Sequence, residues 1–170
     1  MMNIKYPNKL FTDEALENTP NRHEKFLAEW GDMNKGFNFT TFSNEGYDQI
    51  ILLKNIEFAS LCEHHLLPFH GSAHIGYIPS DLICGVSKLA RVVDKFACCP
   101  QLQERLTQQI ADFLWEQLKP KGVIVVLEAA HDCMRIRGVK KQNSVMVTSA
   151  LKGVFAEDEK PRVEFLSLIK

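Results

Sequence analysis

Apolar residues recur along the chain at two spacings, one typical of strands and the other of helices. Residues 72–78 alternate, with Ala73, Ile75 and Tyr77 on one face. This alternation predicts a strand that Pro79 ends. Further strands are predicted at residues 48–58, 123–129 and 145–148, and a short terminal element at 163–169.

A first helix is predicted near the N-terminus. Thr19 is a candidate N-cap and Pro20 suits the first helical position. The helix is expected to continue through Trp30 and to stop at Gly31. Residues 31–48 contain three glycines among scattered aromatic residues and are predicted to be a loop.

Two more helices are predicted in the middle of the chain. Residues 87–96 have apolar side chains at helical spacing, and Ser87 is a candidate N-cap. Pro100 suits the first turn of the next helix, which Pro120 ends. Its apolar stripe is Leu102, Leu106, Ile110, Phe113, Leu114 and Leu118. Adjacent strands with helices grouped between them predict an α+β fold with an antiparallel sheet.

Composition narrows the class of protein without identifying it. The chain has 170 residues, 45% hydrophobic and 24% charged, with a formal net charge of −1. This balance argues against a general nucleic-acid binder. The sequence has no apolar run long enough for a membrane helix and no apolar N-terminal signal, so we expect a cytoplasmic protein without membrane partners. The five cysteines are an odd number in a chain of this size, so metal binding or burial is expected rather than disulfides.

Two short segments carry the strongest chemical signal. Cys62 and His65 lie three positions apart just after a predicted strand, and Cys133 follows the strand at 123–129. If the two segments meet at one end of the sheet, three ligands can hold a zinc ion and leave a fourth position open, as in catalytic zinc sites. A zinc finger would need a second close ligand pair, which the other cysteines do not supply.

The alternative for any single cysteine is burial as a small hydrophobe, and Cys84, Cys98 and Cys99 are assigned to that class. Bound zinc would lower the pKa of a water molecule to about 7. His64 and His131 are then candidates for moving protons, with an exposed or supporting histidine as the alternative for each.

Basic residues gather near these segments and suit a polyphosphate. Lys88 and Arg91 share one face of the helix at 87–96, and that helix's N-terminus also attracts anions. If the segment after Cys133 is extended, Arg137 shares its face. The alternative is that each is an ordinary solvated charge. Further candidates are Arg22 and Lys25 on the first helix, and Arg135.

Gln103 and Glu104 open the long helix. A carboxylate can accept hydrogen bonds from the N–H groups on one edge of guanine, and a neighbouring amide can contact its other polar atoms. On spacing alone, a first-turn acid that complements the helix dipole is the simpler reading of Glu104.

Taken together, residues 57–155 strongly resemble GTP cyclohydrolase I, in a short version of that family. Thr19 to Arg22 followed by Lys25 also resembles the family's first helix. The matching pieces are Ser60–Phe69, His74–Pro79, Gly85–Arg91, Gln103–Thr107, His131–Met134, Arg137-Gly138, Thr148-Ser149 and Gly153–Phe155.

The resemblance implies a role for each matching residue. Zinc would be held by Cys62, His65 and Cys133, while His64 and His131 handle protons. Glu104, helped by Gln103, would anchor guanine, and Ser87 would lie near the ribose. Triphosphate would be bound by Lys88, Arg91 and Arg137, with Arg22 and Lys25 arriving from a neighbouring subunit. Glu63 has no role in this scheme.

The implied reaction opens the imidazole ring of GTP, releases formate and forms 7,8-dihydroneopterin triphosphate for folate, pterin or deazaguanine synthesis. The implied fold is the tunnelling fold, with residues 1–48 as an N-terminal helical segment and loop and 49–170 as the catalytic domain. Members form rings, typically a decamer of two pentamers with active sites between subunits. Two alternatives stay open: a purine-binding protein of this fold without turnover, and a cyclohydrolase with a shifted nucleotide preference.

Overall fold

The computed structural model describes residues 11–32 and 36–170, and the chain divides into two compact units, 1–33 and 34–170. The first unit contains helix α1 (Asp13–Asp32). The prediction that Thr19 caps this helix and Pro20 begins it is wrong, whereas the end at Asp32 lies one residue after the predicted stop at Gly31. Thr12 Oγ1 accepts the N–H of Ala15 at 3.2 Å and caps the helix seven residues before Thr19. Pro20 lies inside the helix, where it removes one backbone donor.

The predicted loop at 31–48 contains a short strand that the sequence analysis missed, although residues 33–35 lie outside the described part. Strand β1 (Thr41–Ser43) pairs antiparallel with β4 (Leu82–Cys84). Its three residues are too few to show alternation, so periodicity could not reveal it.

The main sheet of the second unit has five strands in the order β5-β2-β3-β6-β7. The long strands pair antiparallel, and only β5 runs parallel to its neighbour β2. Gly71 of β3 allows a close approach to β6, because a Cβ there would lie 1.9 Å from Glu128 O. The strands are β2 (Ile51–Cys62), β3 (Pro68–Ile78), β5 (Pro100–Gln101), β6 (Gly122–His131) and β7 (Met146–Gly153).

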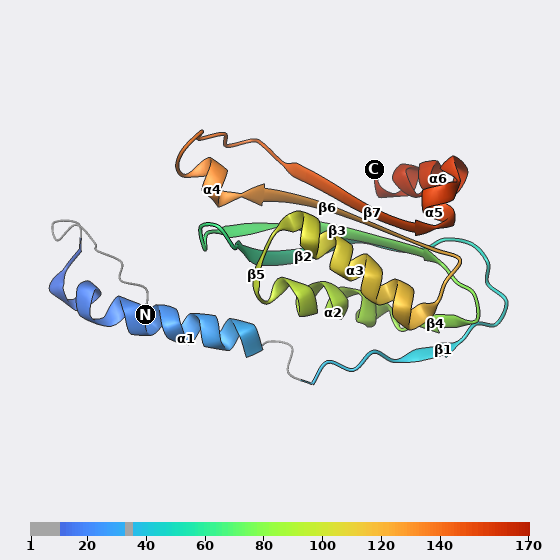
Figure 1. Ribbon diagram of the computed structural model, residues 1–170, viewed down its shortest axis with the longest axis horizontal. Helices are drawn as coiled ribbons and strands as arrows, with labels where there is room; N and C mark the ends of the chain where they lie inside the picture. Colours follow the sequence, from blue (N-terminus) through green and yellow to red (C-terminus); the bar gives the residue numbers. More distant parts are fainter. Residues whose placement is uncertain (1–10, 33–35) are drawn as a thin grey trace. The chain divides into compact units, whose positions relative to one another are not determined.

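Helices α2 (Val86–Ala97) and α3 (Gln103–Leu118) cover one face of this sheet (Figure 1). The predicted alternation in β3 is confirmed, since Ala73, Ile75 and Tyr77 are fully buried against these helices. The α+β class with two long helices on one face is therefore confirmed. Pro100, however, belongs to β5 and not to the first turn of α3, because it pairs with Leu61.

A second, smaller core lies on the opposite face of the sheet. The terminal element predicted at 163–169 is part of helix α6 (Glu159–Ile169), which follows the short helix α5 (Val154–Glu157). Phe155 and Phe165 from these helices pack on Ile124 and Val126 of β6. Strand β6 is thus covered on both faces over most of its length, which explains why residues 122–127 are all apolar rather than alternating.

The register between β3 and β6 determines where the candidate metal ligands and His131 lie. Phe69 at the start of β3 pairs with His131 at the end of β6. The turn between β2 and β3 and the short helix α4 (Asp132–Arg135) therefore lie at the same end of the sheet, away from α5 and α6 (Figure 1). None of the helices in the described part of the chain combines the length and apolar character needed to cross a bilayer.

Candidate metal centre

Cys62 and His65 are brought together by a tight turn after β2. The Cys62 N–H donates to Leu67 O at 2.9 Å, and Cys62 O accepts the N–H groups of His65 and Leu66 at 3.1 and 2.8 Å. Leu66 adopts a left-handed backbone with φ of 52°, which is costly for a residue with a branched side chain. The turn leaves Cys62 Sγ 3.6 Å from His65 Nδ1.

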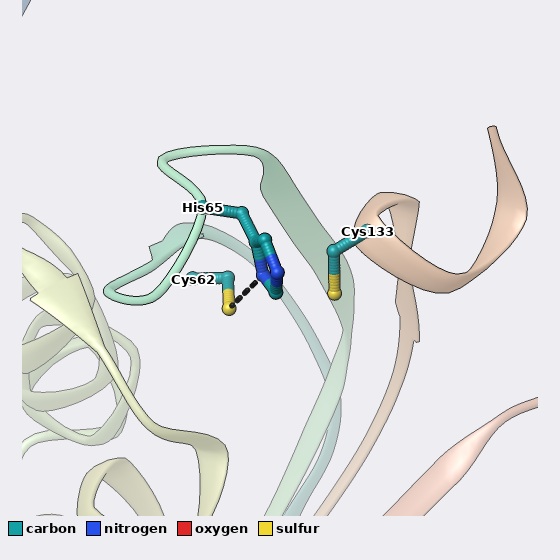
Figure 2. Close-up of side chains that lie close together, drawn as sticks. All are labelled: Cys62, His65 and Cys133. Carbon is teal, nitrogen blue, oxygen red and sulfur yellow. Dashed lines mark hydrogen bonds between the residues drawn. The ribbon is translucent and has the colours of Figure 1, made fainter. Parts of the chain in front are cut away.

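Cys133 reaches the same place from α4, one residue into the helix that follows β6. The ligand atoms of Cys62, His65 and Cys133 all lie within 4.8 Å of one another. Figure 2 shows the three side chains, with Cys62 and His65 on one turn and Cys133 facing them from α4. The prediction that the segments at 62–65 and 131–133 meet at one end of the sheet is confirmed.

The arrangement fits a tetrahedral zinc ion. Zinc–sulfur bonds of about 2.3 Å and zinc–nitrogen bonds of about 2.1 Å place neighbouring ligand atoms about 3.6 Å apart. The Cys62–His65 separation of 3.6 Å matches this edge. Two thiols and one imidazole are ligands that zinc prefers, and three protein ligands leave a position for water or substrate.

The electrostatics of Cys133 also favour a bound cation. Burial raises the pKa of the Cys133 thiol, and the neighbouring Cys62 raises it further, while Arg137 acts in the opposite direction. Two adjacent thiolates repel each other, so both lose their protons readily only when a metal neutralises them.

Arg137 lies beyond a helical turn, and the conditional prediction of an extended segment after Cys133 is wrong. Residues 132–135 form α4 and Ile136 remains in the right-handed region, so Arg137 follows Cys133 by about one helical turn. Arg135 and Asp132 form an ion pair within this turn, with Nη1 of Arg135 lying 3.9 Å from Oδ1 of Asp132. The helical turn still leaves Arg137 close enough to influence the Cys133 thiol.

His131 is the last residue of β6 and lies two residues before the candidate metal ligand Cys133. Its ring stacks on Phe69 with centroids 4.7 Å apart and an interplanar angle of 4°. Burial lowers the pKa of His131, and the nearby Glu104 carboxylate partly opposes that shift. The Phe69 contact was missed by the sequence analysis, although Phe69 follows the ligand turn directly.

Gln103 connects this histidine to the sheet. The side chain is 1% exposed, and its Oε1 lies 2.8 Å from His131 Nε2. Its Nε2 lies within 3.1 Å of three acceptors: Leu127 O, Met146 O and Thr148 Oγ1. The amide is therefore engaged within the protein on both sides.

Glu104 and His64 are both exposed to solvent. Glu104 lies in the first turn of α3, as predicted. The His64 ring lies edge-on to His65, with centroids 6.1 Å apart. Glu63, which had no assigned role, pairs with Arg105 of α3. Arg105 was not singled out from the sequence, because an exposed arginine on a helix gives no periodic signal.

The anion-binding candidates on α2 lie in its first two turns. Helix α2 begins at Val86 with Gly85 as N-cap, so the prediction that Ser87 caps it is wrong. Ser87 is instead exposed in the first turn. Lys88 Nζ donates to Asn38 O at 2.6 Å, and Arg91 is exposed. Within residues 36–170, no hydrogen bond or ion pair joins Lys88 or Arg91 to the candidate metal ligands.

Arg22 and Lys25 lie on α1 in the first unit, where Arg22 pairs with Glu14. Of the remaining cysteines, Cys98 is buried and Cys84 is half-buried, as expected for small apolar residues, and neither forms a disulfide. For Cys99 the expectation of burial is wrong. It is exposed because it lies at the turn that follows α2.

The sequence matches a known protein family and several of its members over most of its length. The family model described as GTP cyclohydrolase I matches residues 4–170. The GTP cyclohydrolase 1 of Aquifex aeolicus is 52% identical over 158 residues, covering 92% of this chain and 85% of that protein. The Sulfurihydrogenibium sp. enzyme of the same name is 51% identical over 157 residues, covering 92% and 83%.

A solved structure supports the fold alone. The apo archaeosine synthase QueF-Like aligns with a TM-score of 0.52 and 16% identity, over 62% of this chain and 94% of that one. The fold is accordingly the expected tunnelling fold. The family match spans nearly the whole chain and includes the three candidate metal ligands Cys62, His65 and Cys133. This chain therefore belongs to the GTP cyclohydrolase I family.

Proposed function

We propose that this protein is a zinc-dependent GTP cyclohydrolase I that converts GTP to formate and 7,8-dihydroneopterin triphosphate. The observation that carries the proposal is the convergence of Cys62, His65 and Cys133 within 4.8 Å, beside His131 and near Glu104. Identity of about 50% to enzymes of that name supports the same assignment. A zinc ligand set alone would fit many hydrolases, whereas this combination fits ring opening of a purine.

Zinc held by Cys62, His65 and Cys133 would supply a Lewis acid that polarises water for attack on C8 of the purine. The chain's own residues do the rest. His64 and His131 flank the ligands and can move protons to the ring nitrogen as the C8–N9 bond and then the formyl group are hydrolysed. The ribose can then rearrange beside Ser87 before the pterin ring closes.

Glu104 is assigned the guanine contact. Its exposed carboxylate can accept two N–H hydrogen bonds from the purine edge, which selects guanine over adenine. Gln103 is not assigned a guanine contact, because its amide is already hydrogen-bonded within the protein. Lys88, Arg91 and Arg137 are proposed to bind the triphosphate through charge-assisted hydrogen bonds.

Arg22 and Lys25 are proposed to complete the phosphate site from a neighbouring subunit. Their position on α1, within a unit separate from residues 34–170, is compatible with such sharing. The proposed assembly is the decamer of two pentamers typical of the family, with residues 49–170 as the catalytic domain. Light scattering of the purified protein measures the assembly directly.

The activity is tested by incubating the zinc-loaded protein with GTP and oxidising the products. The proposal predicts a fluorescent pterin that depends on both zinc and GTP. A fully metallated oligomer that leaves GTP unchanged would contradict the activity, and it would favour a purine-binding protein of the same fold.

A further inference from the structure

The Gln103 amide has only one orientation compatible with its neighbours. Leu127 O and Met146 O lie 3.1 and 3.0 Å from Nε2, and a backbone carbonyl can only accept a hydrogen bond. The amide nitrogen must therefore face these carbonyls, and Oε1 must face away from them. Orientation of an amide follows from such a network rather than from atom positions alone.

This orientation fixes what His131 must offer. Gln103 Oε1 lies 2.8 Å from His131 Nε2 and is itself an acceptor, so Nε2 must carry a hydrogen. The ring cannot turn away easily, because it stacks on Phe69 at an interplanar angle of 4°. If Nδ1 carried the hydrogen instead, the lone pairs of His131 Nε2 and Gln103 Oε1 would face each other at 2.8 Å. Flipping the amide would instead bring its oxygen against two carbonyl oxygens.

We propose that Gln103 is a positioning residue that holds His131 in the Nε2–H tautomer and leaves Nδ1 as the nitrogen that accepts a proton during turnover. In the described part of the chain no hydrogen bond occupies His131 Nδ1. The tautomer assignment stands on geometry alone. Its consequence for catalysis rests on the proposed function, so the two are tested by different readouts.

The tautomer is measured directly by ¹⁵N solid-state NMR of the zinc-loaded protein labelled at histidine. His131→Gln identifies the His131 signals by their disappearance. The expected spectrum shows a protonated Nε2 and an unprotonated Nδ1 at pH 8, which lies above the ordinary histidine pKa of about 6.5. A protonated Nδ1, or an averaged pair of signals, overturns the proposal whether or not the protein turns over GTP.

Two variants test the part played by Gln103. Gln103→Met preserves side-chain length and removes both the amide oxygen and the amide nitrogen, and it is expected to give a mixture of His131 tautomers. Thr148→Val is the matched control: it removes one amide contact and leaves Leu127 O and Met146 O in place. Thr107, which also contacts Thr148, keeps its hydrogen bond to Gln103 O. The control is expected to retain the single Nε2–H tautomer.

Turnover separates positioning from substrate binding. If wild-type protein converts GTP, Gln103→Met is expected to lower kcat roughly 10- to 100-fold with KM changed less than about two-fold, because general acid–base catalysis contributes about 10²- to 10⁴-fold. A raised KM at unchanged kcat would show that Gln103 contacts guanine and would overturn the positioning role. A single Nε2–H tautomer in Gln103→Met would overturn it as well.

Discussion

Glu63 and Arg105 form an ion pair that joins the ligand turn to helix α3. The connection is reinforced on both sides: Arg105 Nε donates to Gln101 Oε1 at 2.8 Å, and the Glu63 N–H donates to Gln101 O at 3.0 Å. The turn that carries Cys62 and His65 is thereby fixed to the helix that presents Glu104. Glu63 thus helps to set the distance between the candidate ligand turn and Glu104.

Glu63→Gln is expected to weaken zinc binding about 10-fold, at the lower end of the effect of residues that support metal ligands. The free energy of unfolding should fall by less than about 1 kcal/mol, because both side chains are partly exposed and water screens the pair. Competition with a zinc chelator measures the first quantity and urea denaturation of the zinc-free protein the second. Glu116→Gln, at an exposed position farther along α3, is the matched control and should change neither.

Cys133→Ser is expected to remove stoichiometric zinc, because a serine hydroxyl is a poor zinc ligand at neutral pH. Metal analysis after dialysis checks this result. Cys99→Ser is the control, since Cys99 is exposed and belongs to no ligand cluster in the described part of the chain. One zinc per subunit retained in Cys133→Ser would show that the ligand assignment is mistaken.

Glu104→Gln is expected to lower kcat/KM for GTP roughly 10- to 100-fold, which corresponds to loss of a charge-assisted hydrogen bond. An amide offers one acceptor and one donor side, so it cannot accept both N–H groups of guanine. Steady-state kinetics with GTP and ATP measure the change. Unaltered kcat/KM for GTP would remove Glu104 from the substrate site.

His74 is expected to make stability depend on pH. The side chain is 4% exposed, and burial lowers its pKa, with Glu128 opposing and Lys54 reinforcing the shift. Below about pH 6.5 His74 is protonated in the unfolded chain but stays neutral in the folded protein. The free energy of unfolding therefore falls with decreasing pH. That loss continues until the pH passes the lowered pKa of the folded state.

His74→Gln keeps a side-chain acceptor and removes the titration. Urea denaturation between pH 5 and pH 8 should therefore give a flatter profile for His74→Gln than for the original protein. Parallel profiles for the two proteins would mean that folded His74 titrates as it does in the unfolded chain.

Much of the fold was predictable because long elements carry periodic signals. The alternation of Ala73, Ile75 and Tyr77 and the stripe along α3 each specify one buried face. Element ends were harder to predict. Thr12 and Thr19 are both acceptable N-caps, and only the structure shows that the helix runs through Pro20. Short strands such as β1 have no period to detect.

The cluster of Cys62, His65 and Cys133 was predictable because cysteine and histidine at close spacing have few other uses. The residues around them were not. Phe69, Thr148 and Arg105 act through contacts between segments far apart in the sequence, which residue type and spacing do not encode. Gln103 was singled out for its position beside Glu104, but its contacts with β6 and β7 depend on the register of the sheet.

The proposed function requires that zinc held by Cys62, His65 and Cys133 promotes opening of the imidazole ring of GTP. The most direct measurement follows GTP labelled with ¹³C at C8 by NMR in the presence of the zinc-loaded protein. We predict that the label appears in formate, with one formate released for each pterin formed, and that Cys62→Ser releases none. Label that stays in the purine ring, or is released as readily by Cys62→Ser, would contradict the proposed function.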